Sequence, residues 1–121
     1  MEKARNHLNQ NDFQGALATY LAIVKRFPGA AEAQTCLVQI GNLTLAHLGD
    51  AAAGLEHFER YLRRNPDGLL AEEAAWGKVS ALSKLGRVVE ERVALEEFLR
   101  QYPRSPHAAR VEKRLQAISR R

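Results

Sequence analysis

Cysteine is almost absent from this chain, because Cys36 is the single one among 121 residues. One cysteine can form neither a disulfide within the chain nor a thiolate metal cluster. We interpret Cys36 as a small buried apolar residue, with a reactive thiol as the alternative. The cysteine count therefore predicts a fold that is held together by packing alone.

Long hydrophobic runs are missing as well. No apolar run approaches the roughly 18 residues that a membrane helix needs. The first ten residues, MEKARNHLNQ, are polar and do not resemble a signal peptide. The sequence thus gives no direct evidence of export and leaves the location open, with the cytoplasm expected only if the chain is not part of an exported protein. A periplasmic or cell-envelope location is expected if the chain is a domain of a longer exported protein.

The motifs of common enzyme classes are also missing: GxxxxGK[ST], GxGxxG, GxSxG, HExxH and CxxC. The four histidines are not spaced as a metal site. Paired carboxylates such as Glu90 and Glu91 are adjacent, so their side chains point to different parts of a helix surface. We expect them on solvated faces. The sequence predicts no catalysis, no cofactor and no bound metal.

Apolar residues that recur three and four positions apart dominate what is present. They predict helices over residues 2–10, 13–27, 30–48, 51–65, 69–85, 88–102 and 106–119. Because no stretch alternates with the period of a strand, we predict an all-α fold. The apolar stripes, which include Phe27, Val89 and Val93, are expected to be buried. Phe58 is expected to be a core residue.

The helix breakers recur at a fixed interval. Pro28, Pro66 and Pro103 are spaced 38 and 37 residues apart, and so are the turn residues Asn11, Gly49 and Gly86. A helix-turn-helix unit repeated at such a period indicates a solenoid, because one hairpin cannot bury its own apolar face. We predict one domain, 1–121, with hairpins at about 2–28, 30–66 and 69–103 and a C-terminal helix at about 106–119.

The middle repeat resembles the tetratricopeptide repeat family. It has a turn glycine at Gly49, a small residue at Gly54, an aromatic residue four positions later at Phe58, and a closing proline at Pro66. The resemblance covers essentially the whole chain and implies a right-handed α–α superhelix. It also implies a non-catalytic scaffold that binds a peptide or a partner helix in a concave groove. That groove would be lined by the first helix of each repeat.

The outer repeats depart from this family pattern. The first repeat keeps Ala16 and Tyr20 but has Asn11 in place of the turn glycine. The third repeat has Glu91 and Leu95 where the small and aromatic residues belong. The period is also three or four residues longer than the family's 34. These departures affect how closely the repeats stack rather than the predicted fold.

Groove positions carried over from the family give a set of candidate partner-binding residues. They are Gln39, Ile40, Leu43 and His47 in the middle repeat, Trp76, Ser80 and Lys84 in the third, and Lys3, Asn6 and Gln10 in the first. Trp76 either anchors a partner or packs against the next helix, and both interpretations stay open. The family's carboxylate-clamp positions hold Ile40, Glu73 and Gly77, so that specific function is not implied.

The C-terminal part of the chain is basic. Residues 100–121 hold seven basic residues and one acid, a net charge of +6, whereas residues 1–99 sum to −2. We interpret this helix as a solvated cap. An acidic protein partner is one alternative, and nucleic-acid binding is a less favoured one, since no aromatic residue is interleaved with the cations.

The stretch from Tyr102 to His107, followed by Arg114 and Leu115, is similar to the endings of bacterial cell-envelope tetratricopeptide domains. The accessory protein of the Tol–Pal system is of this type. The resemblance implies a bacterial envelope protein. An oligomerisation module of a larger envelope or regulatory protein, whose partner is a second copy, is the alternative to a peptide-binding scaffold.

Overall fold

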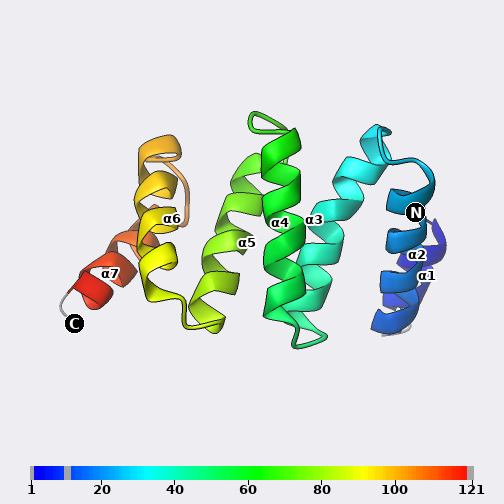
Figure 1. The fold of residues 1–121 in the computed structure, drawn as a ribbon, viewed down its shortest axis with the longest axis horizontal. Helices are drawn as coiled ribbons and strands as arrows, with labels where there is room; N and C mark the ends of the chain where they lie inside the picture. Colours follow the sequence, from blue (N-terminus) through cyan, green and yellow to red (C-terminus); the bar gives the residue numbers. More distant parts are fainter. Residues whose placement is uncertain (1, 10–11, 120–121) are drawn as a thin grey trace.

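The computed structural model describes residues 2–9 and 12–119 as a row of helical hairpins (Figure 1). Within these ranges there are seven α-helices and no β-strand. The helices are α1 (Glu2–Asn9), α2 (Phe13–Arg26), α3 (Ala31–Ala46), α4 (Ala51–Arg64), α5 (Ala71–Lys84), α6 (Val88–Gln101) and α7 (Ala108–Ser119). Successive helices lie side by side along the long axis, so the fold is the expected all-α superhelix.

The second helix of each hairpin begins at an equivalent position with nearly the same backbone. Asp12 and Asp50 cap α2 and α4, since their Oδ1 atoms accept hydrogen bonds from Gly15 N (2.9 Å) and Ala53 N (3.0 Å). The Gly15 N–H holds the pKa of Asp12 below its usual value. In the third repeat Arg87 occupies the cap, and its guanidinium has no acceptor atom for this bond.

The two turn glycines have the left-handed backbone that favours glycine at the end of a helix. Gly49 has φ +63° and Gly86 has φ +71°, a left-handed backbone that disfavours side chains with a Cβ. Asn11, the predicted turn residue of the first repeat, lies outside the described residues.

Each second helix also ends in the same way. Phe27, Asn65 and Tyr102 have φ/ψ of −130°/58°, −137°/61° and −131°/57°, and each directly precedes a proline. Proline disfavours helical geometry in the residue before it, so the helix stops there. Three identical endings, spaced 38 and 37 residues apart, show that the sequence repeat is a structural repeat.

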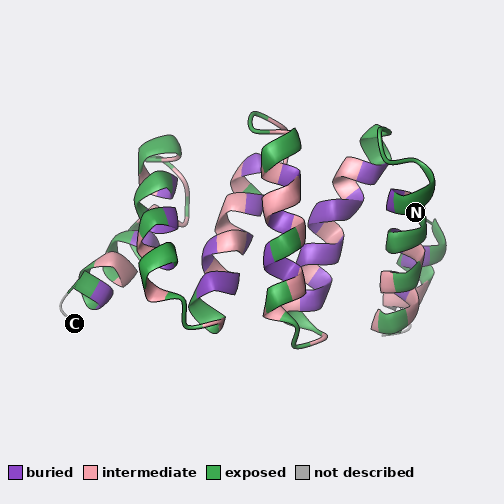
Figure 2. Ribbon diagram, viewed as in Figure 1, coloured by how far each residue is buried: buried purple, intermediate pink, exposed green. Residues whose placement is uncertain are grey.

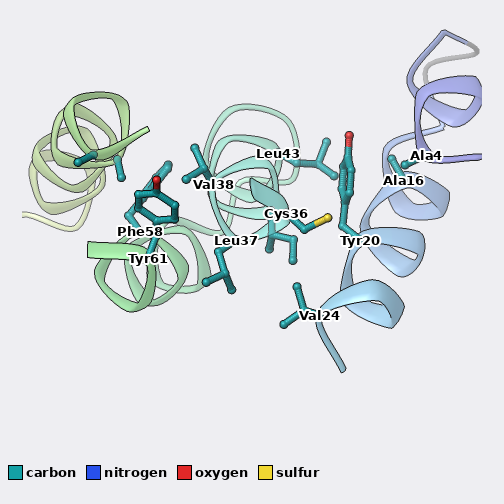
Figure 3. Packing of buried hydrophobic residues seen from close by; sticks show 13 residues of the cluster. Ala4, Ala16, Tyr20, Val24, Cys36, Leu37, Val38, Leu43, Phe58 and Tyr61 are labelled. Atoms are coloured by element: carbon teal, nitrogen blue, oxygen red, sulfur yellow. The ribbon is translucent and has the colours of Figure 1, made fainter. Parts of the chain in front are cut away.

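Phe58 on α4 lies at the centre of the core, as predicted, and is fully buried. Its ring lies against Gly41 of α3 and Gly77 of α5; a Cβ built on Gly41 would be 2.6 Å from Phe58 Cε1. In Figure 3, Phe58 and Tyr61 pack on one side of α3, and Tyr20 of α2 packs on the other. The two glycines therefore let the neighbouring first helices close around one aromatic ring.

Three residues of the predicted apolar stripes are exposed instead of buried. The exposed fractions are 53% for Phe27, 76% for Val89 and 52% for Val93. Figure 2 shows the buried segments concentrated on α3 and α5, whereas the side of α6 that faces the viewer is largely exposed. Phe27 follows the last residue of α2. The guanidinium carbon of Arg26 lies over its ring, 5.4 Å from the ring centroid. The apolar residues of these helices thus cover a wider surface than the part that contacts neighbouring helices.

The last helix begins two residues later than predicted, at Ala108. Ser105 and Pro106 lie in the preceding turn. Ser105 Oγ accepts a hydrogen bond from His107 N (3.1 Å), and Ala108 N donates to Ser105 O (3.0 Å). The second bond spans three residues, one fewer than an α-helical bond.

Candidate partner-binding groove

The candidate residues of the middle and third repeats lie at equivalent positions of α3 and α5, 37 residues apart. Gln39 corresponds to Trp76, Leu43 to Ser80 and His47 to Lys84. The two helices contact each other directly. The structure nevertheless divides these residues between two separate hollows.

The first hollow, which we name the Gln39 depression, lies between α1, α2 and α3. It has a volume of about 190 Å³ and is lined by Leu8, Tyr20, Gln39, Asn42, Leu43, Ala46 and His47. Gln39 is half-buried and His47 is exposed. The His47 ring stacks on Phe13 with 4.2 Å between centroids and 9° between planes. The stack fixes the position of an imidazole that solvent can reach.

Ile40 does not belong to this surface, and Leu43 contributes only its edge. Ile40 is fully buried and Leu43 is 3% exposed, so both are core residues. The reason is that α3 is covered by α2 on one side and by α4 on the other. In the first repeat, Lys3 and Asn6 are exposed on α1, and Gln10 lies outside the described residues.

The second hollow, which we name the Trp76 pocket, lies between α5, α6 and α7. It has a volume of about 300 Å³. Its lining residues are Trp76, Val79, Ser80, Ser83, Lys84, Glu91, Leu95, Arg110, Val111 and Arg114. Of the seven candidate residues of the middle and third repeats, Trp76, Ser80 and Lys84 therefore meet in one place.

Trp76 packs against neighbouring elements and also lines the pocket. It is half-buried and packs edge-on against Phe98, with 6.1 Å between ring centroids. It also stacks on His107 of the following turn at 4.2 Å and 6°. The guanidinium carbon of Arg110 lies 5.7 Å from the Trp76 ring centroid. The indole is thus held rigidly by its neighbours and still forms a wall of the pocket.

The other two residues flank the indole along α5. Ser80 Oγ donates to the carbonyl of Trp76 at 3.1 Å, so its own hydrogen-bonding group is already engaged. Lys84 is exposed, and its Nζ donates to Leu45 O of α3 at 3.4 Å, a long bond. Of the two, Lys84 is the one that can offer charge to a partner.

An ion pair between α6 and α7 lines the pocket, with a buried carboxylate and a partly exposed guanidinium. Glu91 is fully buried, and Arg114 of α7 binds it through two bonds: Nε to Oε2 at 2.7 Å and Nη2 to Oε1 at 3.0 Å. The hydrogen bond to Glu91 raises the pKa of Arg114 above its usual value. The prediction that Glu91 lies on a solvated face is therefore wrong. A buried carboxylate has to be paired, and Arg114 supplies the partner.

A family model for the tetratricopeptide repeat matches residues 1–41 and 43–110. The chain belongs to the tetratricopeptide repeat family. Repeats of this family generally mediate protein–protein interactions, and the fold is typically a non-catalytic scaffold. A search of curated proteins finds no match.

Glu91 occupies the position that the tetratricopeptide pattern reserves for a small residue. Ala16 and Gly54 hold this position in the first two repeats. At Gly54 a Cβ would be only 3.2 Å from Gly41 O, so the helices there touch through their backbones. The α5–α6 pair packs less closely than the α3–α4 pair. In the α5–α6 hairpin the larger Glu91 side chain occupies this position and lines the Trp76 pocket.

The departure from the tetratricopeptide pattern was visible in the sequence, but its consequence was not. A glutamate at a small-residue position predicts either exposure or a buried partner. Finding that partner requires knowing that Arg114, 23 residues later, returns to the same place. The spacing of the C-terminal cations alone did not indicate this contact.

Positive charges outnumber negative charges around the Trp76 pocket. Lys84, Arg110 and Arg114 line it together with one acid, Glu91. Arg114 and Glu91 neutralise each other, so Lys84 and Arg110 define the residual potential. The pocket therefore has an apolar floor and a cationic rim.

Two further results concern metals and membranes. Over residues 2–9 and 12–119, no group of three or more His, Cys, Asp and Glu side chains could hold a metal ion. Within the same ranges, no helix has the length and apolar character needed to span a bilayer.

Cys36 is buried, and burial raises the pKa of its thiol. It is therefore a poor nucleophile near neutral pH.

Proposed function

We propose that this tetratricopeptide domain binds an acidic protein segment, with an apolar side chain of that segment in the Trp76 pocket. The observation that carries the proposal is the pocket itself, in which Val79 contributes to an apolar floor and Trp76 forms a wall beneath a rim with Lys84 and Arg110. An apolar centre inside a polar rim is the arrangement typical of protein interfaces. The excess positive charge would favour an acidic partner, mainly through the encounter rate.

The Gln39 depression supplies the second contact of the proposed groove. Gln39 and His47 present polar groups there, with Leu43 contributing an apolar edge. Asn42, which also lines this depression, donates through Nδ2 to Glu73 Oε1 at 3.1 Å and links α3 to α5. A bound segment would place one side chain in each hollow. The distance between the hollows would then determine which residue of the segment occupies each one.

The fluorescence of Trp76 tests the proposal, because it is the single tryptophan of the sequence. The probe is a synthetic peptide with one leucine flanked by glutamates, and the control peptide has lysines in their place. We expect the acidic peptide to shift the emission and the basic one to leave it unchanged. Equal responses to both peptides would contradict the proposal.

Matched variants locate the binding site. Lys84→Glu and Arg110→Glu should each weaken the acidic peptide about five- to tenfold, since both line the pocket. Lys113→Glu is the control, because Lys113 is exposed on α7 and lies outside the lining set. Trp76→Ala should cost about 1–2 kcal/mol of binding energy. If Trp76→Ala leaves no folded protein, Trp76→Phe keeps an aromatic wall, and the charge variants still decide.

Self-association is a second candidate function, favoured by a specific surface at the other end of the domain. Phe27 is 53% exposed beside a hollow of about 330 Å³ between α1 and α2. That hollow is lined by Lys3, Ala18, Thr19, Ala22, Ile23, Arg26 and Phe27. A second copy of the chain is the partner that this candidate implies.

A partner in a bacterial cell envelope is a narrower proposal, and it rests on the likeness of residues 102–108 to envelope domains of this family. In the domain, Ser105 of this stretch donates through Oγ to Glu72 Oε2 at 3.1 Å and joins the last turn to α5. A structural role therefore accounts for part of the likeness. Fractionation of the native host, with antibody detection, would place the protein in or out of the envelope.

A further inference from the structure

Valine occupies two exposed positions of α6. Val89 and Val93 are 76% and 52% exposed. The repeat provides an internal comparison, since the same two positions are exposed in all three second helices. The other repeats fill them with Gln14 and Ala18 in α2 and with Ala52 and Glu56 in α4. Packing therefore does not explain large apolar side chains in the third repeat alone.

The valines border a groove that follows the length of α6. We name it the outer groove; it lies over α5, between α4 and α6, which stand on either side of α5 in Figure 1. It consists of two hollows of about 250 and 160 Å³ that share Lys78, Ala94 and Glu97. The first hollow reaches Val89 and the second reaches Gln101, so the groove spans nearly all of α6.

The floor of the outer groove is apolar and its rim is acidic. Leu62, Leu82 and Phe98 contribute to the floor. Glu59, Glu90 and Glu97 line the rim, and Lys78 is the cation among the lining residues. Lys78 Nζ lies 3.7 Å from Glu59 Oε2, so these two charges largely cancel. Glu90 and Glu97 leave a net negative potential beside the valines.

We propose that the outer groove is a second interaction surface, which binds a basic amphipathic segment of a partner protein. Apolar side chains of that segment contact Val89 and Val93, and its lysines or arginines face Glu90 and Glu97. The outer groove and the Trp76 pocket are lined by different residues and favour opposite charges. The inference is therefore independent of the function proposed above.

The chain's own basic helix does not fit this description, which argues against a second copy as the occupant. Of the large apolar side chains of α7, Val111 and Ile118 are fully buried, and Leu115 is partly buried against the same core. The cations of α7 therefore come without a free apolar stripe, so we assign the outer groove to a segment of a partner protein.

The probe for this proposal is a 14-residue peptide of leucine and lysine with a helical amphipathic pattern. It is titrated into the isotope-labelled domain, and the amide shifts are followed by NMR. We expect the shifts to concentrate on α4 and α6, while the Trp76 emission stays constant. A peptide with glutamate in place of lysine should not produce them. Binding of that acidic peptide in the outer groove with equal affinity would overturn the proposal.

Variants of the exposed valines provide the decisive comparison. Val89→Ser combined with Val93→Ser should raise the Kd of the leucine–lysine peptide about tenfold, because the apolar contact is lost. The matched control is Gln14→Ser combined with Ala52→Ser, at the positions of α2 and α4 equivalent to Val89, which should change the Kd by less than about twofold. All four positions are exposed, so every variant should fold.

Two other results would also overturn the proposal. One is an unchanged Kd for the double valine variant, which would mean that the valines are not part of the binding surface. The other is a wild-type domain that self-associates in sedimentation and becomes monomeric with the valine variant. That result would make a second copy the occupant of the outer groove. Failure of the acidic peptide at Trp76 would leave this experiment unaffected.

Discussion

Phe58 illustrates how a single side chain organises this stack. Its ring reaches the neighbouring first helices on both sides because Gly41 and Gly77 have no Cβ at the points of contact. The sequence identified Phe58 as a core residue from its place in the repeat. It did not identify the two glycines as the walls of its site, because they lie on other helices and at different positions of the repeat.

The first prediction concerns the stability contributed by Phe58. Phe58→Ala should lower the free energy of unfolding by about 3–5 kcal/mol, because it leaves a cavity between three helices that cannot collapse. Urea unfolding followed by circular dichroism measures this change. Val93→Ala is the control, since Val93 is half exposed and its truncation should cost under about 0.5 kcal/mol. Equal midpoints for Phe58→Ala and wild type would contradict the packing described.

The second prediction concerns the pair of Glu91 and Arg114. Arg114→Met should destabilise the domain toward the lower end of about 3–5 kcal/mol, because it leaves a buried carboxylate unpaired while Arg114 itself is partly exposed. Adding Glu91→Gln should recover part of that loss, since the buried charge is removed with its partner. A double-mutant cycle from urea unfolding gives the coupling between the two residues. Additive losses would mean that the pair does not act as a unit.

The residues of the candidate site show what a repeat pattern can and cannot predict. Carry-over from the family selected Trp76, Ser80 and Lys84 as candidates, and these three residues of α5 line one pocket. The same reasoning placed Ile40 at the surface, where it is in fact fully buried. A helix in the middle of a stack is covered on more sides than a pattern of one helix can reveal. Glu91 escaped prediction because its partner lies in another helix.

At the scale of the helices, the turn residues are the part of the sequence that predicts the helix boundaries most directly. Gly49, Gly86 and the residues before the three prolines impose backbone conformations that few alternatives satisfy. These signals are local, so the helix ends are predicted to within about two residues. Which side of a helix is covered is not a local property. Val89 and Val93 follow the apolar spacing of α6 and are nevertheless exposed.

The third prediction compares two equivalent helix caps. Asp50→Ala should cost about 1 kcal/mol of stability, because the hydrogen bond from Ala53 N to Asp50 Oδ1 is lost. Arg87→Ala at the equivalent position of the third repeat should cost much less, since the guanidinium cannot accept that bond. Urea unfolding of the two variants measures the difference. Equal losses would show that the cap bond does not stabilise α4.

At the scale of the whole molecule, the three hairpins share one backbone plan but present different surfaces. Tyr20, Phe58 and Leu95 occupy the same position in successive repeats, and each is buried. The α3–α4 hairpin is the most closely packed, whereas the α5–α6 hairpin, which holds Glu91, packs less closely. The ends of the stack have fewer neighbours than the middle. Surfaces that the fold does not use for stacking are therefore available for partners.

The last prediction concerns the end formed by α1 and α2. If two copies pair symmetrically through this end, each contributes the same patch, in which Phe27 and Ile23 would meet their counterparts. The same symmetry brings Lys3 and Arg26 of both copies together. We therefore expect weak self-association that strengthens as salt screens this repulsion, for example between about 0.05 and 0.5 M NaCl. Sedimentation equilibrium at both salt concentrations measures it.

A salt response of this sign separates the α1–α2 end from the other surfaces of the domain. Association between the basic rim of the Trp76 pocket and the acidic outer groove would pair opposite charges, and salt would weaken it. Phe27→Ser should abolish the pairing through the α1–α2 end, whereas Val93→Ser should leave it intact, because Val93 lies on α6. A monomer at every concentration and at both salt levels would rule out self-association as a function of the domain. Pairing that weakens with salt would instead place the contact between surfaces of opposite charge.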